Sequence, residues 1–220
     1  MSNASLSAKP LVELPVNDFL RRLAGSDPTP GGGSASALSG AVAASLVSMV
    51  GGLTTGRAGF EEVAETIEIM VEQGHQIAGV LGAAVDRDAA AYDQVTAAFK
   101  LPKATDAEKT ARSQAIQAAM THAADVPFEV AEECLAAAEL AMIALEKGNP
   151  NATSDAAVAL LHALTGLEGA VLNVAINLDS IKDAAYVSEK TSEIKRLVTR
   201  SEELRTAGWQ IIRERFQALG

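Results

Sequence analysis

Apolar residues recur every three or four positions along most of this 220-residue chain, and no stretch of strand length alternates apolar with polar side chains. This spacing is typical of α-helices with one apolar face. We therefore expect an all-α fold, a bundle of long antiparallel helices that forms a single domain over residues 1–220, with residues 1–10 disordered. The predicted helices cover residues 16–23, 34–53, 60–99, 106–146, 153–178 and 181–218.

The segment 34–53 has no charged side chain and is about as long as a membrane span. Five serines and several glycines interrupt it, however, and no basic cluster follows it to set a membrane topology. We predict no membrane partner and a buried central helix that its neighbours approach closely. Its larger apolar residues are spaced for packing: Leu38, Val42, Leu46, Val47 and Val50.

The composition, 48% hydrophobic with only 4% aromatic, indicates an aliphatic core. A net charge of −10 argues against a nucleic-acid partner, although a local basic patch could receive an acidic small molecule. The lone cysteine, Cys134, and the lack of a secretory signal pattern predict a cytoplasmic protein. The candidate basic patch for an acidic small molecule is Lys100, Lys103, Lys109 and Arg112.

Long alanine-rich helices leave broad apolar faces, so we expect a homodimer or larger assembly.

A glycine-rich loop precedes the central helix. Prolines end a preceding helix, glycines allow positive φ and close approach, and the first amides of the next helix have no internal partner. Such a junction can hold an anion or a carbonyl oxygen. The loop matches neither the phosphate-binding nor the dinucleotide fingerprint, so a simple turn remains the alternative. Its sequence is Pro28-Thr29-Pro30-Gly31-Gly32-Gly33-Ser34.

Asp88 breaks the apolar pattern of the third predicted helix. At 100° per residue it falls among Leu81, Ala84, Val85, Tyr92, Val95 and Phe99, whereas Asp86 and Asp93 point away. A carboxylate on a core-facing stripe has a raised pKa and can exchange protons near neutrality, as a general acid or base must. The alternative is a structural role, in which Asp88 accepts hydrogen bonds from the backbone or serines of the central helix.

The fifth predicted helix carries a second set of polar residues on one face. Glycines beside them leave room, and the amides and imidazole offer donors and acceptors, so the face predicts a slot for a flat polar heterocycle. The alternatives are close helix packing for the glycines, buried networks for the asparagines, a core histidine, and helix capping for Asp155. The stripe consists of Asp155, His162, Gly166, Gly169, Asn173 and Asn177.

Other catalytic schemes lack the residues they need. The three histidines, His75, His122 and His162, lie on separate predicted helices without carboxylates or cysteine at metal-ligand spacing, so we expect no metal. Cys134 has no electropositive or histidine-bearing local context, and no serine lies in a nucleophile-elbow sequence. We therefore expect neither covalent catalysis nor a bound cofactor.

An ordered series of short motifs over nearly the whole chain resembles the cyclodeaminase/cyclohydrolase family of folate enzymes. The series is far more specific than any one of its members. It comprises Pro28–Ser34, Met49-Val50, Leu53-Thr54, Asp88-Ala89-Ala90-Ala91-Tyr92, Leu101-Pro102-Lys103, Val126-Pro127, Gly148-Asn149, Ser154-Asp155 and Asn173-Val174-Ala175-Ile176-Asn177.

The resemblance implies an all-helical dimer that acts on a one-carbon unit at N5 and N10 of tetrahydrofolate, which is the substrate and not a bound cofactor. We expect a cyclohydrolase that converts 5,10-methenyltetrahydrofolate to 10-formyltetrahydrofolate. The alternatives are a formimidoyltetrahydrofolate cyclodeaminase, which releases ammonia, and a non-catalytic folate-binding dimer. Whether the site lies within one subunit or between two stays open.

The resemblance and the residue patterns together suggest roles in catalysis. Both reactions pass through a tetrahedral carbon and need a proton shuttle, which we assign to Asp88. Asn173, Asn177 and Asp155 would hold the pterin and the bridge carbon. The amides of Gly31–Ser34 would face a substrate carbonyl or carboxylate, and Arg57 would meet the glutamate carboxylate of the folate.

Overall fold

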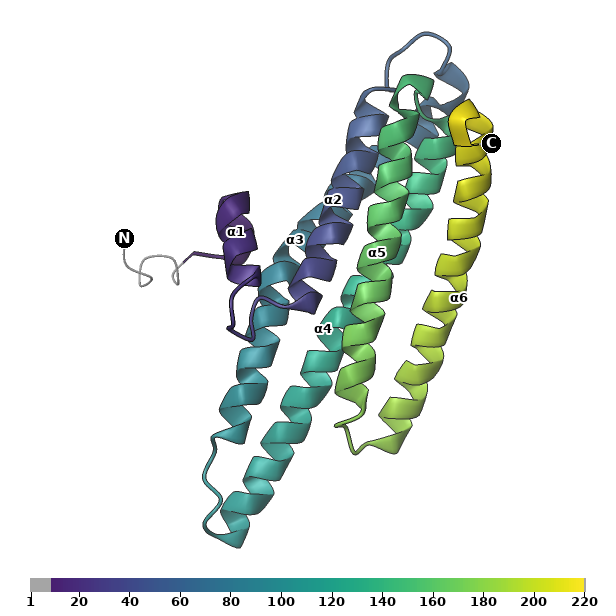
Figure 1. Cartoon of the computed structure of the whole chain (residues 1–220). Coiled ribbons are helices and arrows are strands. Elements are labelled where there is room, and N and C mark those ends of the chain that lie inside the picture. Colours follow the sequence, from purple (N-terminus) through teal and green to yellow (C-terminus); the bar gives the residue numbers. More distant parts are fainter. Residues whose placement is uncertain (1–8, 220) are drawn as a thin grey trace.

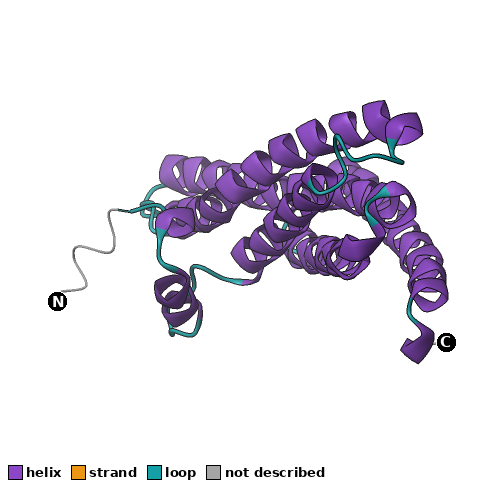
Figure 2. Ribbon diagram, turned by 90° about the horizontal axis from the view of Figure 1, so that it is seen from above, coloured by secondary structure: helices purple, strands orange, loops and turns teal. Residues whose placement is uncertain are grey.

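The computed structural model describes residues 9–219, and all regular structure in that range is helical (Figures 1 and 2). The predicted all-α fold is therefore confirmed. Most of the segment predicted to be disordered lies outside the described residues. The α-helices are α1 (Val16–Leu23), α2 (Gly32–Gly52), α3 (Ala64–Phe99), α4 (Asp106–Lys147), α5 (Thr153–Leu178) and α6 (Ala184–Arg215).

Helix α2 packs against α3, α4 and α5, while α6 covers α4 and α5. Small residues allow these helices to approach closely. A Cβ atom on Gly40 would overlap the side chains of Cys134 on α4 and Leu81 on α3. A Cβ atom on Gly166 of α5 would lie 2.8 Å from the sulfur of Cys134, so three helices meet at this cysteine.

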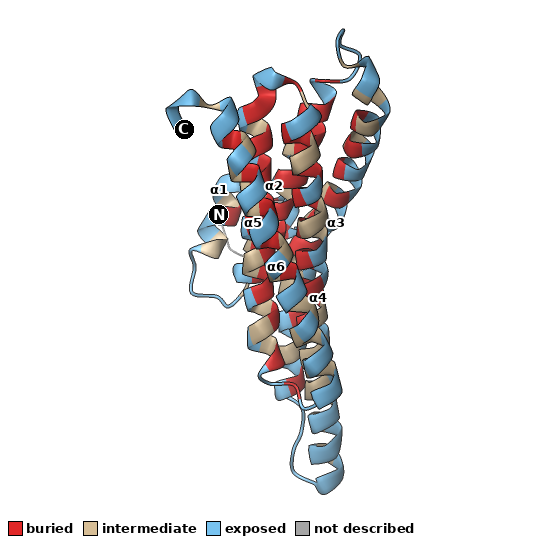
Figure 3. Ribbon diagram, turned by 90° about the vertical axis from the view of Figure 1, so that its right-hand side faces the viewer, coloured by how far each residue is buried: buried red, intermediate tan, exposed pale blue. Residues whose placement is uncertain are grey.

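Helices α3 and α4 are the two longest, with 36 and 42 residues, and their hairpin extends beyond the first turn of α2 (Figure 1). The projecting end is mostly exposed (Figure 3). α4 begins in a capping box, in which the amide of Glu108 donates to Thr105 Oγ1 at 3.2 Å and the Thr105 amide donates to the Glu108 carboxylate at 2.8 Å. This cap explains why the predicted start of the helix agrees with the structure.

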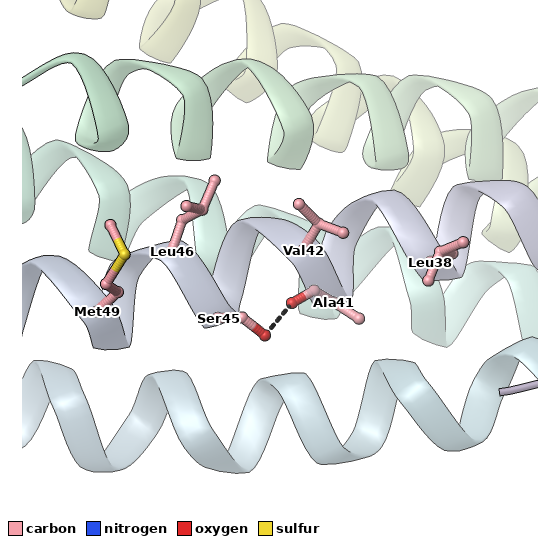
Figure 4. A pocket seen from close by; sticks show the side chains of 6 residues that line it. All are labelled: Leu38, Ala41, Val42, Ser45, Leu46 and Met49. Carbon is pink, nitrogen blue, oxygen red and sulfur yellow. Dashed lines mark hydrogen bonds between the residues drawn. The ribbon is translucent and has the colours of Figure 1, made fainter. Parts of the chain in front are cut away.

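The prediction of a buried central helix is wrong for one side of α2. Val47 and Val50 are buried, but Val42 is 38% exposed, and Leu38 and Leu46 are only partly covered. The reason is that α3, α4 and α5 surround α2 on one side only. The opposite side forms a shallow groove of about 380 Å³ (Figure 4), lined by Leu38, Ala41, Val42, Ser45, Leu46 and Met49.

Two segments, Gly32–Gly52 and Pro150–Leu178, are long and apolar enough to cross a membrane. Half of the most apolar window of each is buried inside the bundle, which is also the behaviour of core helices in a soluble protein.

Candidate active site

The glycine-rich loop brings α2 into contact with the polar residues of both α3 and α5. A Cβ atom on Gly33 would overlap the carboxylate of Asp88, and one on Gly32 would lie 3.3 Å from Nδ2 of Asn173. These glycines are needed for close approach and not for positive φ, which glycine adopts in the described residues only at Gly56 and Gly59. The start of α2 therefore lies against both Asp88 and Asn173, so the two pattern-breaking faces meet at the glycine-rich loop.

Asp88 is partly buried and accepts hydrogen bonds from Ser34. The Ser34 hydroxyl lies 3.0 Å from Asp88 Oδ2 and 2.9 Å from the carbonyl oxygen of Val85. Burial raises the pKa of Asp88, and hydrogen bonds from the side chain and backbone of Ser34 oppose that rise. The expected structural contacts of Asp88 are thus present, and its pKa is shifted in the direction that suits a general acid or base.

No cation pairs with Asp88 among residues 9–219. The adjacent Arg87 forms an ion pair with Glu129 of α4 at 2.7 Å, and Asp86 holds the N-terminal segment by accepting from the amide of Leu11 at 2.6 Å. Once Asp88 ionises, the region beside Gly33 therefore carries an unpaired negative charge, which would stabilise a positively charged substrate carbon.

The carboxamides of α5 are anchored by their nitrogen atoms. Asn173 Nδ2 donates to the carbonyl oxygen of Gly169 at 2.8 Å, and Asn177 Nδ2 donates to that of Ala123 on α4 at 2.7 Å. Their Oδ1 atoms accept no hydrogen bond from the described part of the chain. Two oriented acceptors on α5 thus remain available for a ligand.

Tyr92 is a candidate substrate contact near Asp88 that the residue pattern did not single out. It lies one helical turn after Asp88 on α3, and it is 44% exposed because α2 begins only at Gly32 and does not cover this part of α3. The pattern placed Tyr92 on a core-facing stripe. An exposed aromatic ring next to an acid–base group is suited to stacking against a flat heterocycle.

The predicted slot along α5 is closed by α2 between residues 162 and 169. His162 Nδ1 lies 3.1 Å from the hydroxyl of Ser39, which also donates to the His162 carbonyl oxygen at 2.9 Å. Gly166 and Gly169 approach Ser36 so closely that a Cβ atom on either would meet it. The glycines serve close helix packing, and the structure does not bring His162 to Asp88.

Asp155 and Arg57 lie at the opposite end of the bundle from Asp88, so a single chain does not bring these three predicted site residues together. Asp155 precedes Asn173 by five helical turns, about 27 Å along α5. Arg57 follows the C-terminal end of α2, which is about 31 Å long. Neither the Asp155 nor the Arg57 side chain makes a hydrogen bond or an ion pair with residues 9–219, and Arg57 is exposed.

The candidate basic patch lies near the tip of the α3–α4 hairpin, and part of it is occupied. Arg112 donates to the carbonyl oxygen of Phe99 at 3.0 Å and its guanidinium lies over the Phe99 ring, 5.6 Å from the centroid. Lys109 pairs with Asp106 at 2.9 Å. Lys100 and Lys103 are exposed.

Cys134 has the environment of an inert core thiol. It is completely buried where α2, α4 and α5 meet, and burial raises the pKa of its thiol to about 12. The thiolate that a nucleophile requires is therefore scarce at neutral pH. Among residues 9–219, no group of three or more histidine, cysteine, aspartate or glutamate side chains could hold a metal ion.

The chain is similar to folate enzymes in sequence and in structure. Residues 15–196 match the family model described as formiminotransferase-cyclodeaminase. A methenyltetrahydrofolate cyclohydrolase of Methylorubrum extorquens is 40% identical over 91% of this chain and 96% of its own length. A formimidoyltransferase-cyclodeaminase of Sus scrofa is 35% identical over 86% of this chain, which spans only 35% of that longer protein.

A solved structure gives the same result for the fold. The crystal structure of a formiminotetrahydrofolate cyclodeaminase from Thermotoga maritima superimposes with a TM-score of 0.81 and 26% sequence identity. The match covers 94% of this chain and 98% of the other.

Proposed function

This chain belongs to the formiminotransferase-cyclodeaminase family, and from that premise we propose that it hydrolyses 5,10-methenyltetrahydrofolate to 10-formyltetrahydrofolate. The observation that carries the proposal is the carboxyl group of Asp88, which has a raised pKa and lies against Gly33 beside an open part of α3. The similarity to the cyclohydrolase extends over nearly the full length of both chains, which favours this reaction over the deaminase.

In the proposed mechanism Asp88 moves one proton. Water attacks the cationic methenyl carbon and forms a C–O bond, and the Asp88 carboxylate accepts a proton from that water. The tetrahedral intermediate then collapses: the hydroxyl proton leaves to solvent, a carbonyl group forms, and the bond from carbon to N5 breaks. Asp88 returns its proton to N5, so one water is consumed and one proton is released overall.

The remaining groups orient the substrate. The free Oδ1 atoms of Asn173 and Asn177 accept hydrogen bonds from N–H groups of the pterin, and the ring of Tyr92 stacks against it. The ionised carboxylate of Asp88 also stabilises the positive charge of the methenyl carbon before attack. The Ser34 amide donates to Asp88, whereas the amides of Gly32 and Gly33 in the first turn of α2 have no acceptor among residues 9–219, which leaves them for a substrate oxygen.

The direct test is spectroscopic. Methenyltetrahydrofolate absorbs in the near ultraviolet, so catalytic amounts of the purified protein should accelerate the loss of that band above the rate in buffer. The alternative is a formimidoyltetrahydrofolate cyclodeaminase, because the similar proteins of Sus scrofa and Thermotoga maritima are cyclodeaminases. It would instead make the band appear from 5-formiminotetrahydrofolate with release of ammonia. A protein that binds folate and produces neither change would be a binding module.

The proposal includes no metal and no organic cofactor, because proton transfer and charge stabilisation suffice for this reaction. Activity should therefore survive dialysis against a strong chelator. It also includes a cytoplasmic location and no nucleic-acid partner, supported by the net charge of −10 and the single buried cysteine. Cell fractionation with an antibody to the protein would test the location.

The proposal also includes a homodimer that forms through the exposed face of α2. The groove on this face is lined by apolar side chains and Ser45 (Figure 4), and no charged residue occurs from Pro28 to Gly56. In a chain with a net charge of −10, this is a surface on which two copies meet with little repulsion.

A further inference from the structure

We infer that the active site is shared between two subunits, in which the partner subunit's Arg57 completes the site around Asp88. The inference rests on the proposed folate reaction and on the proposed homodimer. It explains why residues that the motifs associate with one site lie at opposite ends of α2 in a single chain. Four arguments support it. They concern the exposed apolar face of α2 and α5, the area of that face, the effect of a two-fold axis on the direction of α2, and the charged groups without partners at the two ends of α2.

The exposed face of α2 continues onto α5. On α2 the residues Leu38, Val42, Ser45 and Met49 are spaced by four, three and four positions and so form one stripe. Contacts between Ser39 and His162 hold α2 and α5 side by side. α5 adds its own exposed apolar residues, which are Val158, Leu172 at 70% exposure and Ile176 at 69%. Contiguous apolar surface of this kind marks an interaction site.

The face is large enough for a second copy of this chain. α2 is about 31 Å long, and two adjacent helices present a width of about 20 Å, so the projected area is roughly 600 Å². Each partner in a standard interface buries about 800 Å² of accessible surface, which exceeds the projected area of the same patch because side chains protrude.

A two-fold axis at the centre of this face reverses the direction of α2. The stripe from Leu38 to Met49 has its midpoint between Ala43 and Ala44. In the sequence, Arg57 lies as many positions after that midpoint as Pro30 lies before it, and α2 itself ends at Gly52, about 13 Å beyond the midpoint. Two antiparallel copies of α2 that cross at a shallow angle would therefore place the partner subunit's Arg57 next to the loop that contacts Asp88. The same operation would bring Asp155 of the partner subunit toward this end.

The unpaired groups at the two ends of α2 are chemically complementary. Asp88 has no cationic partner, and the guanidinium of Arg57 has no anionic one among the described residues. Folate substrates carry a cationic carbon in the methenyl form and carboxylates at the glutamate end. A site with Asp88 from one subunit and Arg57 from the other would hold both kinds of charge at once, with the arginine binding a carboxylate in two-pronged geometry.

The test compares two heterodimers, isolated from co-expressed chains that carry different affinity tags. One pairs D88N with R57A, and the other pairs wild type with the D88N/R57A double variant. In a shared site the first heterodimer has one intact site and keeps about half of the wild-type kcat/KM, whereas both sites of the second are damaged. If the site lies within one subunit, the two results exchange.

Three results would overturn the inference: the exchanged pattern, an R57A homodimer with wild-type kcat/KM, or a monomeric active enzyme. R57A alone should lower kcat/KM on the order of ten- to hundredfold, the usual effect of losing a charged hydrogen bond. Arg57 makes no contact that the fold needs, so R57A should fold, and R57K is the variant that keeps the charge. The wild-type homodimer in the same assay separates a failure of the shared site from a failure of the proposed reaction.

Discussion

The hydroxyl of Ser34 lies within hydrogen-bond distance of two acceptors, the carboxylate of Asp88 and the carbonyl oxygen of Val85. The Ser34 oxygen lies 3.0 Å from Asp88 Oδ2 and 2.9 Å from the carbonyl oxygen of Val85, but the hydroxyl has only one hydrogen to donate. When Asp88 is ionised, donation to its carboxylate is favoured. When Asp88 is protonated, the hydroxyl can turn to Val85 and accept from the carboxylic acid. The geometry thus serves both protonation states that a proton shuttle must visit.

Replacing Asp88 with Asn should lower turnover by about two orders of magnitude or more, which is the usual contribution of a positioned acid or base. The carboxamide has the same shape and can still accept from Ser34, so folding and folate binding should persist. Steady-state hydrolysis of methenyltetrahydrofolate measures the turnover, and circular dichroism with equilibrium folate binding supplies the control. Turnover close to that of the wild type would remove Asp88 from proton transfer.

Replacing Ser34 with Ala should raise the pKa of Asp88 further, because the hydroxyl donor that stabilises the carboxylate is lost while burial remains. If ionised Asp88 is the base, activity disappears as pH falls through its pKa. The acidic limb of the kcat/KM profile should therefore move to higher pH in S34A. S34T, which keeps the hydroxyl, should retain the wild-type limb. An unchanged limb in S34A would contradict the coupling.

The residue pattern predicted which polar side chains lie near the glycine-rich loop better than it predicted their distances along the helices. Asp88 and Asn173 were found because a polar group on a core-facing stripe is costly, and the structure places both against the glycine loop. The pattern grouped Asp155 with them although it lies about 27 Å from Asn173 along α5, because a helical wheel gives the angle around the axis and not the height along it. The helical wheel also could not show that α2 covers His162, or that α2 begins too far along the bundle to cover Tyr92.

Asp88 should also make the fold less stable at neutral pH than D88N. Burial raises its pKa in the folded state above the unfolded value near 3.8, so the folded protein binds more protons in the interval between the two. The contribution of Asp88 to stability is then fully present below the unfolded-state pKa and decreases as pH rises through the folded-state pKa. Denaturant unfolding should show D88N to be more stable than wild type at pH 7, with the difference vanishing near pH 3.

Replacing Gly33 with Ala should displace the Asp88 carboxylate, since the added methyl group would overlap it. Overpacking of this kind costs about 1–3 kcal/mol, and turnover should fall with it because the carboxylate moves. The matched control is Gly79→Ala on α3, where no atom lies within 4 Å of the new Cβ and helix propensity favours alanine by about 1 kcal/mol. Equal stability and turnover of the two variants would refute the close-approach role of Gly33.

Replacing Val42 with Glu should convert the homodimer to monomers. Val42 lies in the groove on α2 and is 38% exposed, so a glutamate there disturbs no core contact but places two like charges near the proposed two-fold axis. Val80→Glu is the matched control, because Val80 on α3 is 42% exposed and lies outside the groove. Light scattering after size exclusion should give the mass of one chain for V42E and of two for V80E. If the wild type is already monomeric, or if V42E stays dimeric, the α2 face is not the interface. If V42E becomes a folded monomer yet keeps full activity, the dimer is right but the shared site is wrong.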